Sequence, residues 1–149
     1  MTRLRETIDT RLPVEDAFAF IADFANAELW DPGVATSERM GHGPVGVGAR
    51  YRLGIRMRGR VAPMEYHVTA FEPPRRVVLT GEGSGVSAVD EIRFEPTATG
   101  TRIDYTADIR LTGWMRLATP FAGAALGRIA TDALGGMRAA LDERAATAR

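Results

Sequence analysis

The feature that most constrains this chain is the order in which two hydrophobic periodicities follow one another. Residues 3–11 alternate as a half-buried strand does, a helical stripe follows, and alternation then returns in a series of segments from residue 35 to residue 111. From residue 113 onward the apolar residues recur at helical steps. Because short, hairpin-type links join the strands, we expect an α+β fold with an antiparallel sheet of about seven strands curved around a long carboxy-terminal helix.

Two short helices are expected between the first and the second strand. Pro13 stands where a first-turn proline belongs, and Glu15 and Asp16 favour the amino-terminal end of a helix. Residues 23–29 have the pattern of a second short helix, which must end before Pro32 because the residue preceding a proline avoids helical backbone angles.

Composition excludes several kinds of chemistry. The 149 residues are enough for one domain, which we place at 1–149. Their zero formal charge gives no reason to expect a nucleic-acid partner. The chain has no cysteine and no lysine, which excludes thiolate and Schiff-base catalysis. His42 and His67 lack the spacing of metal ligands, so we expect neither a metal site nor a cofactor.

Nothing in the chain has the pattern of a targeting or membrane segment. The first six residues contain no apolar signal core. The longest weakly polar run, residues 117–127, is about half as long as the ~20 residues that span a bilayer. We therefore expect a soluble, cytoplasmic protein without membrane insertion, either a monomer or a homodimer.

Two glycine-rich segments admit a functional interpretation. Residues 41–48 contain four glycines, but no Lys-Ser/Thr pair and no helix follows, so we expect a flexible loop at the mouth of a pocket rather than a phosphate-binding loop. Gly135 and Gly136 lie inside the long helix, where each glycine costs about 1 kcal/mol relative to alanine. They predict either close packing of that helix or room for a ligand.

Four short motifs, in this order along the chain, resemble those of the polyketide cyclase/dehydrase-like branch of the START/Bet v 1 (SRPBCC) superfamily. They are Pro-Val-Glu-Asp-Ala-Phe from Pro13, Trp30-Asp31-Pro32, residues 69–77 around Pro73-Pro74, and Gly-Thr-Arg-Ile from Gly100. The resemblance implies a helix-grip fold with a deep, mostly apolar cavity between sheet and helix. Members bind lipids, sterols, polyketides or hormones, and some catalyse cyclisation or dehydration. The motifs belong to the framework, so they assign no catalytic residue.

Strand parity predicts which polar side chains enter that cavity. If Thr69 and Phe71 point inward before the turn at Pro73, then His67 and Glu65 on the same strand point inward too, unless a bulge reverses them. Asp90 shares the face of an otherwise apolar strand. We therefore predict a catalytic or ligand-orienting cluster of His67, Glu65 and Asp90, with the hydroxyls of Tyr51 and Tyr105 nearby. His67 would be the general acid or base, and a carboxylate would hold its tautomer.

A structural interpretation of the same residues stays open. Asp90 would then pair with Arg58 or Arg102, since a buried acid is usually paired, and His67 would be half-buried and satisfied. Large side chains elsewhere predict a ligand-binding wall, with plain core packing as the alternative. The predicted lining residues are Trp30, Tyr51, Leu53, Ile55, Met57, Tyr105, Trp114, Phe121 and Met137.

Three functions are compatible with these observations. The first is binding of a hydrophobic small molecule, lipid-like or polyketide-like, inside the cavity. The second is an acid–base polyketide cyclase or dehydratase that uses His67 with Glu65 or Asp90. The third is a protein-interaction module of the chaperone-activator type, which would require a sizeable exposed apolar patch.

Overall fold

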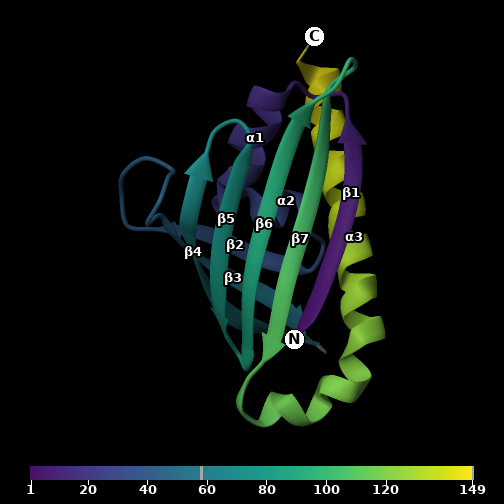
Figure 1. The fold of residues 1–149 in the computed structure, drawn as a ribbon. Coiled ribbons are helices and arrows are strands. Elements are labelled where there is room, and N and C mark those ends of the chain that lie inside the picture. The colour runs from purple at the N-terminus through teal and green to yellow at the C-terminus, as the bar shows by residue number, and fades with distance from the viewer. Residues whose placement is uncertain (58, 149) are drawn as a thin grey trace.

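In the described part of the chain, seven strands form one antiparallel sheet with the helices on one side of it (Figure 1). The computed structural model describes residues 1–57 and 59–148, without the side chains of residues 118–124. The strands are β1 (Thr2–Thr10), β2 (Val34–Met40), β3 (Arg50–Met57), β4 (Arg60–Glu72), β5 (Arg76–Gly83), β6 (Val86–Pro96) and β7 (Thr101–Leu111).

The strand order in the sheet is β1-β7-β6-β5-β4-β3-β2. Strands β2 to β7 therefore follow one another as hairpins, and β1 pairs with the last strand, Thr2 opposite Ile109 and Thr10 opposite Thr101. The antiparallel sheet predicted from the alternating segments is confirmed. Half of each strand's residues face inward, because successive side chains of a strand point to opposite faces.

The helices lie at the two ends of the chain. After β1 come α1 (Val14–Ala22), the 3₁₀ turn η1 (Phe24–Asn26) and α2 (Ala27–Trp30), so the second predicted short helix is confirmed as two consecutive turns. After β7 come η2 (Gly113–Ala118) and α3 (Thr119–Thr147). Figure 1 shows η2 curving away from the end of β7 before α3 runs back beside β1. None of the helices in the described part of the chain has the length and apolarity that a bilayer crossing requires.

The start of β7 is attached to the segment that follows β1. A Cβ atom on Gly100 would lie 2.0 Å from the carbonyl oxygen of Thr10, so only glycine fits there. The next residue, Thr101, is fully buried, and its hydroxyl donates a hydrogen bond of 2.7 Å to the carbonyl oxygen of Leu12. The Gly100-Thr101 motif thus serves to pack β7 against the segment after β1, as expected of a framework motif.

The hydrophobic core fills one end of the space between the curved sheet and the helices. The Phe18 ring of α1 packs against Phe71 and Phe94, with ring centroids 5.3 and 5.1 Å apart. From the second half of α3, Met137 and Leu141 are completely buried. Beside the first half of α3 the packing is looser, and the cavity described below lies there.

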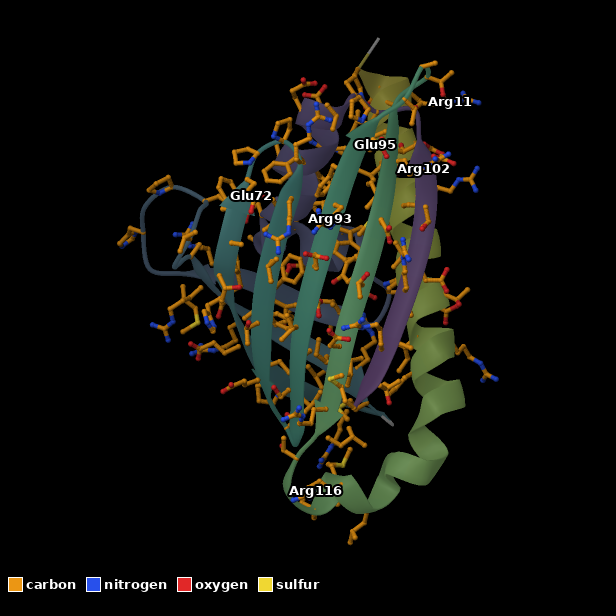
Figure 2. All side chains as sticks on the ribbon, in the orientation of Figure 1. Arg11, Glu72, Arg93, Glu95, Arg102 and Arg116 are labelled. Carbon is orange, nitrogen blue, oxygen red and sulfur yellow. The ribbon has the colours of Figure 1, made fainter. Side chains whose placement is uncertain are left out.

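The outer face of the sheet carries paired charges. Arg3 and Asp108 are 2.7 Å apart, and the Arg5–Asp104 pair is 2.6 Å long. Figure 2 shows charged side chains, Arg93 and Arg102 among them, along this face. Such exposed pairs contribute little to stability, about 0–1 kcal/mol each, but they keep the outer face solvated.

Candidate functional site

A cavity of about 220 Å³ lies between the sheet and the first half of α3. Its wall is mostly apolar and is built by strands β1, β2, β3, β4, β6 and β7, the end of α2 with the turn after it, and α3. The apolar lining includes Trp30, Ile55, Met57, Met64, Ala107, Ile109, Leu126 and Leu134. The polar and charged lining residues are Glu6, Asp31, Arg56, Tyr66, Asp90 and Tyr105.

Asp90 is a buried acid in this apolar wall. Its residue surface is 6% exposed, and its neighbours two residues away on β6, Ala88 and Ile92, are buried as well, so its predicted inward position is confirmed. Tyr105 lies opposite Ile92 on β7, which makes it the diagonal neighbour of Asp90 on the same face. The Tyr105 hydroxyl donates a hydrogen bond of 2.5 Å to Asp90 Oδ2.

Burial raises the pKa of Asp90 from 3.8 to about 6. Loss of hydration disfavours the carboxylate, and the charges of Asp31 and Asp108 act in the same direction. The hydrogen bond from Tyr105 acts in the opposite direction because it stabilises the ionised form. A carboxyl group with this pKa can exchange a proton near neutral pH.

A second carboxyl group enters the cavity from the turn after α2. Asp31 Oδ1 accepts a hydrogen bond of 2.8 Å from the backbone N–H of Gly33, and desolvation raises the pKa of Asp31. The preceding residue, Trp30, packs edge-on against Tyr105 with ring centroids 6.4 Å apart. Trp30 Nε1 is buried and has no hydrogen-bond partner among the described residues. No set of three or more acidic or histidine side chains in the described chain is arranged to hold a metal ion.

Tyr66 brings a second phenol to the site. It is directly opposite Gly81 in the β4–β5 ladder, and a Cβ atom on Gly81 would lie 2.4 Å from the Tyr66 ring. The glycine therefore makes room for the ring. Burial raises the pKa of Tyr66 well above 10, and the nearby charges of Asp90 and Asp31 add to the effect, so the phenol stays protonated and can donate a hydrogen bond.

Comparison of the sequence with models of protein families identifies the family to which the chain belongs. The model of the polyketide cyclase/dehydrase and lipid transport family matches residues 1–142. The chain belongs to this family. Membership and fold together indicate ligand binding. No curated protein matches the chain significantly.

Solved structures with the same fold come from distant bacteria. A START superfamily protein from Mycobacterium smegmatis is 15% identical, with a TM-score of 0.76 and 99% coverage of both chains. A protein from Thermus thermophilus is 16% identical over 94% of this chain and 97% of its own, with a TM-score of 0.75. A Rhodobacter sphaeroides protein is 20% identical over 98% and 93% of the two chains, with a TM-score of 0.71. These similarities support the helix-grip fold.

In this family member, the predicted cluster of His67, Glu65 and Asp90 does not form. Phe71 points inward as expected, but Thr69 is exposed. The β4–β5 register shifts between Val68 and Ala70, and that bulge reverses the parity of the preceding residues. His67 and Glu65 consequently lie exposed on the outer face, where Glu65 pairs with Arg50. The cyclase hypothesis that depends on His67 is therefore wrong.

The alternative expectation for Asp90, pairing with arginine, is also wrong for Arg102. That guanidinium bonds to Asp9 at 3.2 Å on the outer face. Arg58 lies outside the described residues. The partner of Asp90 is Tyr105, which the sequence had placed nearby.

Four of the nine residues predicted for the ligand-binding wall line the cavity, namely Trp30, Ile55, Met57 and Tyr105. Three further predicted residues are buried in the core instead, Tyr51, Leu53 and Met137. Trp114, on η2, is 76% exposed, so its predicted place in the wall is wrong. The side chain of Phe121 lies outside the described residues.

Two residues of the site were missed by reasoning from the sequence. Tyr66 lies between Glu65 and His67, the two residues that strand parity placed on the inner face. The bulge, which was not recognised in the sequence, turns Tyr66 inward and the other two outward. Asp31 was noted only as part of the Trp30-Asp31-Pro32 framework motif. Its position next to a predicted lining tryptophan was the available signal.

Neither glycine-rich segment has the role in ligand binding that was considered for it in the sequence. No residue of the 41–48 loop lines the cavity, so the prediction of a loop at its mouth is not supported. Gly136 faces the turn after α2, where a Cβ atom would lie 2.2 Å from the Trp30 carbonyl oxygen. Close packing therefore explains Gly136.

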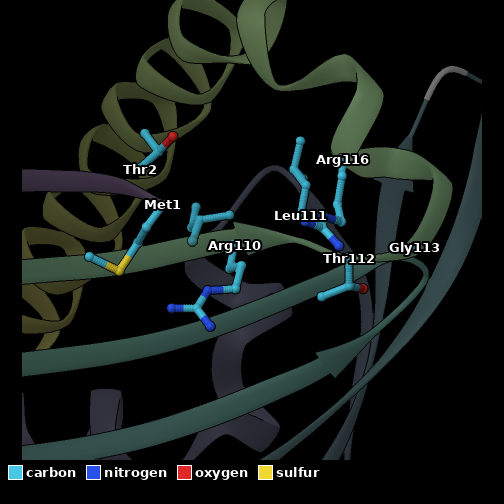
Figure 3. Close-up of a pocket in the computed structure, with 8 residues that line it drawn as sticks. Met1, Thr2, Arg110, Leu111, Thr112, Gly113 and Arg116 are labelled. Carbon is cyan, nitrogen blue, oxygen red and sulfur yellow. The ribbon is translucent and has the colours of Figure 1, made fainter.

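A larger hollow of about 620 Å³ lies outside this cavity, at the ends of β1 and β7 (Figure 3). Figure 3 shows Met1, Arg110 and Arg116 around it. Most of its lining residues are exposed, and it contains no buried acid or aromatic ring. The smaller internal cavity is the better candidate for a binding site, because ligand sites combine an apolar wall with a few placed polar groups.

Proposed function

We propose that this protein binds a small hydrophobic molecule in the cavity between the sheet and α3. The observation that supports it is the apolar wall around the buried Asp90 and its hydrogen-bond partner, the half-buried Tyr105. Apolar surface removed from water contributes about 25 cal/mol per Å² to binding, and a few polar groups fix the ligand's orientation. The volume of about 220 Å³ is below the range of about 300–1,000 Å³ that is usual for drug-sized ligands. The ligand is therefore small.

Filling the cavity tests this proposal. Ala107 lines the cavity, whereas its neighbour Thr106 faces the outer surface among charged residues. Ala107→Phe should abolish the thermal shift produced by small apolar compounds and any co-purifying molecule seen by native mass spectrometry. Thr106→Phe is the matched control, because it adds a ring of the same kind one residue away on the opposite face. Equal binding by both variants would contradict the proposal.

A second candidate function is acid–base catalysis at the same place, and the raised pKa of Asp90 favours it. With a hydroxy ketone in the cavity, the Asp90 carboxylate would take the proton from the carbon next to the carbonyl group. The Tyr66 hydroxyl would stabilise the resulting oxyanion by hydrogen bonding. Asp90 would then return the proton to the leaving hydroxyl group, which departs as water while the new double bond forms.

Mass spectrometry of small hydroxy ketones incubated with the protein tests this second candidate. Asp90→Asn should keep the binding of the ketone and stop the loss of water. Loss of water at an unchanged rate in Asp90→Asn would contradict a catalytic role for Asp90. Binding without any reaction in the unmodified protein would leave the first proposal alone.

A further inference from the structure

Asp90 gives the cavity a hydrogen-bond acceptor, beside two donors, the Trp30 indole N–H and the Tyr66 phenol. Asp90 Oδ2 accepts from Tyr105, and Asp90 Oδ1 has no hydrogen-bond partner among the described residues. The carboxyl group lines the cavity at 6% residue exposure, so the free oxygen has little access to bulk water. An ionised carboxylate only accepts hydrogen bonds, so a ligand that donates one at this point would give Asp90 Oδ1 a partner.

Most of the charged residues that line the cavity are acidic. Among its lining residues Glu6, Asp31 and Asp90 are acids, and Arg56, itself exposed, is the one base. From α3, Asp132 adds a further negative charge that acts on Asp31. Neither Asp90 nor Asp31 forms an ion pair with an arginine in the described part of the chain. The cavity is therefore a place of low hydration and negative potential.

Three aromatic side chains also line this negatively charged cavity. Trp30, Tyr66 and Tyr105 all line the cavity, and the Trp30 and Tyr105 rings are in edge contact. The face of an aromatic ring attracts a cation, by about 0.5–1 kcal/mol when exposed and about 2 kcal/mol when desolvated. Aromatic rings and a carboxylate both favour a positively charged ligand group, such as an organic ammonium group.

We propose that the ligand is a small amine with an apolar body, whose protonated nitrogen donates a hydrogen bond to Asp90 Oδ1. This inference rests on the proposed function, because it assigns the chemical class of the molecule that the cavity binds. The apolar body lies against the aliphatic wall, and the ammonium group lies between Asp90 and the aromatic rings. A carbonyl or carboxylate ligand is disfavoured at the same point, since it would set an acceptor against an acceptor.

Three probes with one apolar body test the proposal, namely phenylbutylamine, phenylbutanol and phenylbutanoate. Calorimetric titration of the full-length protein at neutral pH should give the amine at least about tenfold higher affinity than the alcohol, and the carboxylate the lowest affinity. In Asp90→Asn the advantage of the amine should disappear, while the alcohol keeps its affinity within about threefold. Asparagine retains an oxygen that can accept from Tyr105, and thermal melting of the variant checks its fold.

The pH dependence distinguishes the amine from a ligand that accepts a hydrogen bond. Amine affinity should rise by up to about tenfold from about pH 5 to pH 7.5, as Asp90 loses its proton. Other titratable or charged groups lie near Asp90: Glu6, Asp31, Arg56, Tyr66 and Tyr105 line the same cavity, and the charge of Asp108 also acts on Asp90. The comparison is therefore made against Asp90→Asn, in which this rise should be absent. A carbonyl ligand that binds the protonated carboxyl group would give the opposite slope.

The outcomes separate this inference from the function on which it rests. If the alcohol binds as tightly as the amine, and Ala107→Phe abolishes both, the cavity binds hydrophobic molecules and the amine proposal is overturned. If the amine keeps its advantage in Asp90→Asn, the proposal is also overturned. If none of the three probes binds, both the proposed function and this inference fail for ligands of this size.

Discussion

Gly136 of α3 lies directly against the carbonyl oxygen of Trp30, at a distance of 2.2 Å from where a Cβ atom would be. The same atom would lie 3.0 Å from Pro32 Cδ. The long helix can therefore approach the turn after α2 only at a residue without a side chain. Because Trp30, the last residue of α2, and Asp31, the first residue after it, both line the cavity, this close approach sets the position of that part of its wall.

Alanine substitutions at the two neighbouring glycines should have opposite effects. Gly136→Ala should destabilise the protein by about 1–3 kcal/mol, because the new methyl group meets backbone that cannot move aside. Gly135 has no atom within 4 Å of its Cβ position, so Gly135→Ala should stabilise by up to about 1 kcal/mol through helix propensity. Urea unfolding of the two variants is the measurement. A stable Gly136→Ala protein would mean that α3 does not contact the turn.

A methyl group at Gly81 should displace Tyr66. The Cβ atom would lie 2.4 Å from the ring, so the phenol must leave its place in the cavity or β5 must shift. We expect Gly81→Ala to lower stability by about 1–3 kcal/mol and to weaken probe binding. The second substitution Tyr66→Leu in the same protein should restore part of the stability, since it removes the ring that is displaced. Failure of that rescue would place the strain elsewhere.

Asp90 should make the protein less stable as the pH rises. Its pKa is raised from 3.8 to about 6 in the native state, so the native state holds the proton more tightly than the unfolded state does. The resulting stabilisation is complete below about pH 3.8 and is lost as the pH rises through about 6. Asp90→Asn should therefore match the unmodified protein near pH 4 and exceed it by about 2–3 kcal/mol above pH 7. Denaturant unfolding of both proteins across this pH range is the check, and equal pH profiles would show that Asp90 is not desolvated.

His67→Ala should leave ligand binding unchanged. The side chain lies on the outer face of β4, away from the cavity, so we expect stability within about 0.5 kcal/mol of the unmodified protein as well. Titration with the alcohol and the amine probes tests this, and Tyr66→Phe, which alters the inward-facing neighbour, is the control that should change affinity. A reduced affinity in His67→Ala alone would mean that β4 is paired in the other register.

The elements of this fold, and half of its polar site, follow from local rules. A period of two residues, the turn residues between strands and the first-turn proline at Pro13 depend only on neighbours in sequence, and they predicted the sheet and the helices. The same alternation placed Asp90 on the inner face, and it did so correctly because β6 pairs with β5 and β7 without a register shift. Parity is reliable wherever a strand is regular.

The other half of the site was decided by tertiary contacts. The shift between Val68 and Ala70 is a property of how β4 pairs with β5, and it brought Tyr66 inward in place of His67 and Glu65. Whether a large side chain lines the cavity or fills the core depends on the distance between α3 and the sheet, which no local pattern encodes. Met137 is packed where that distance is short, and Leu134, one helical turn earlier, faces the cavity. The sequence alone thus determined the order of the elements and the inward position of Asp90. The tertiary structure decided which residues surround Asp90, because a bulge and a close approach between helices arise only when distant segments pack together.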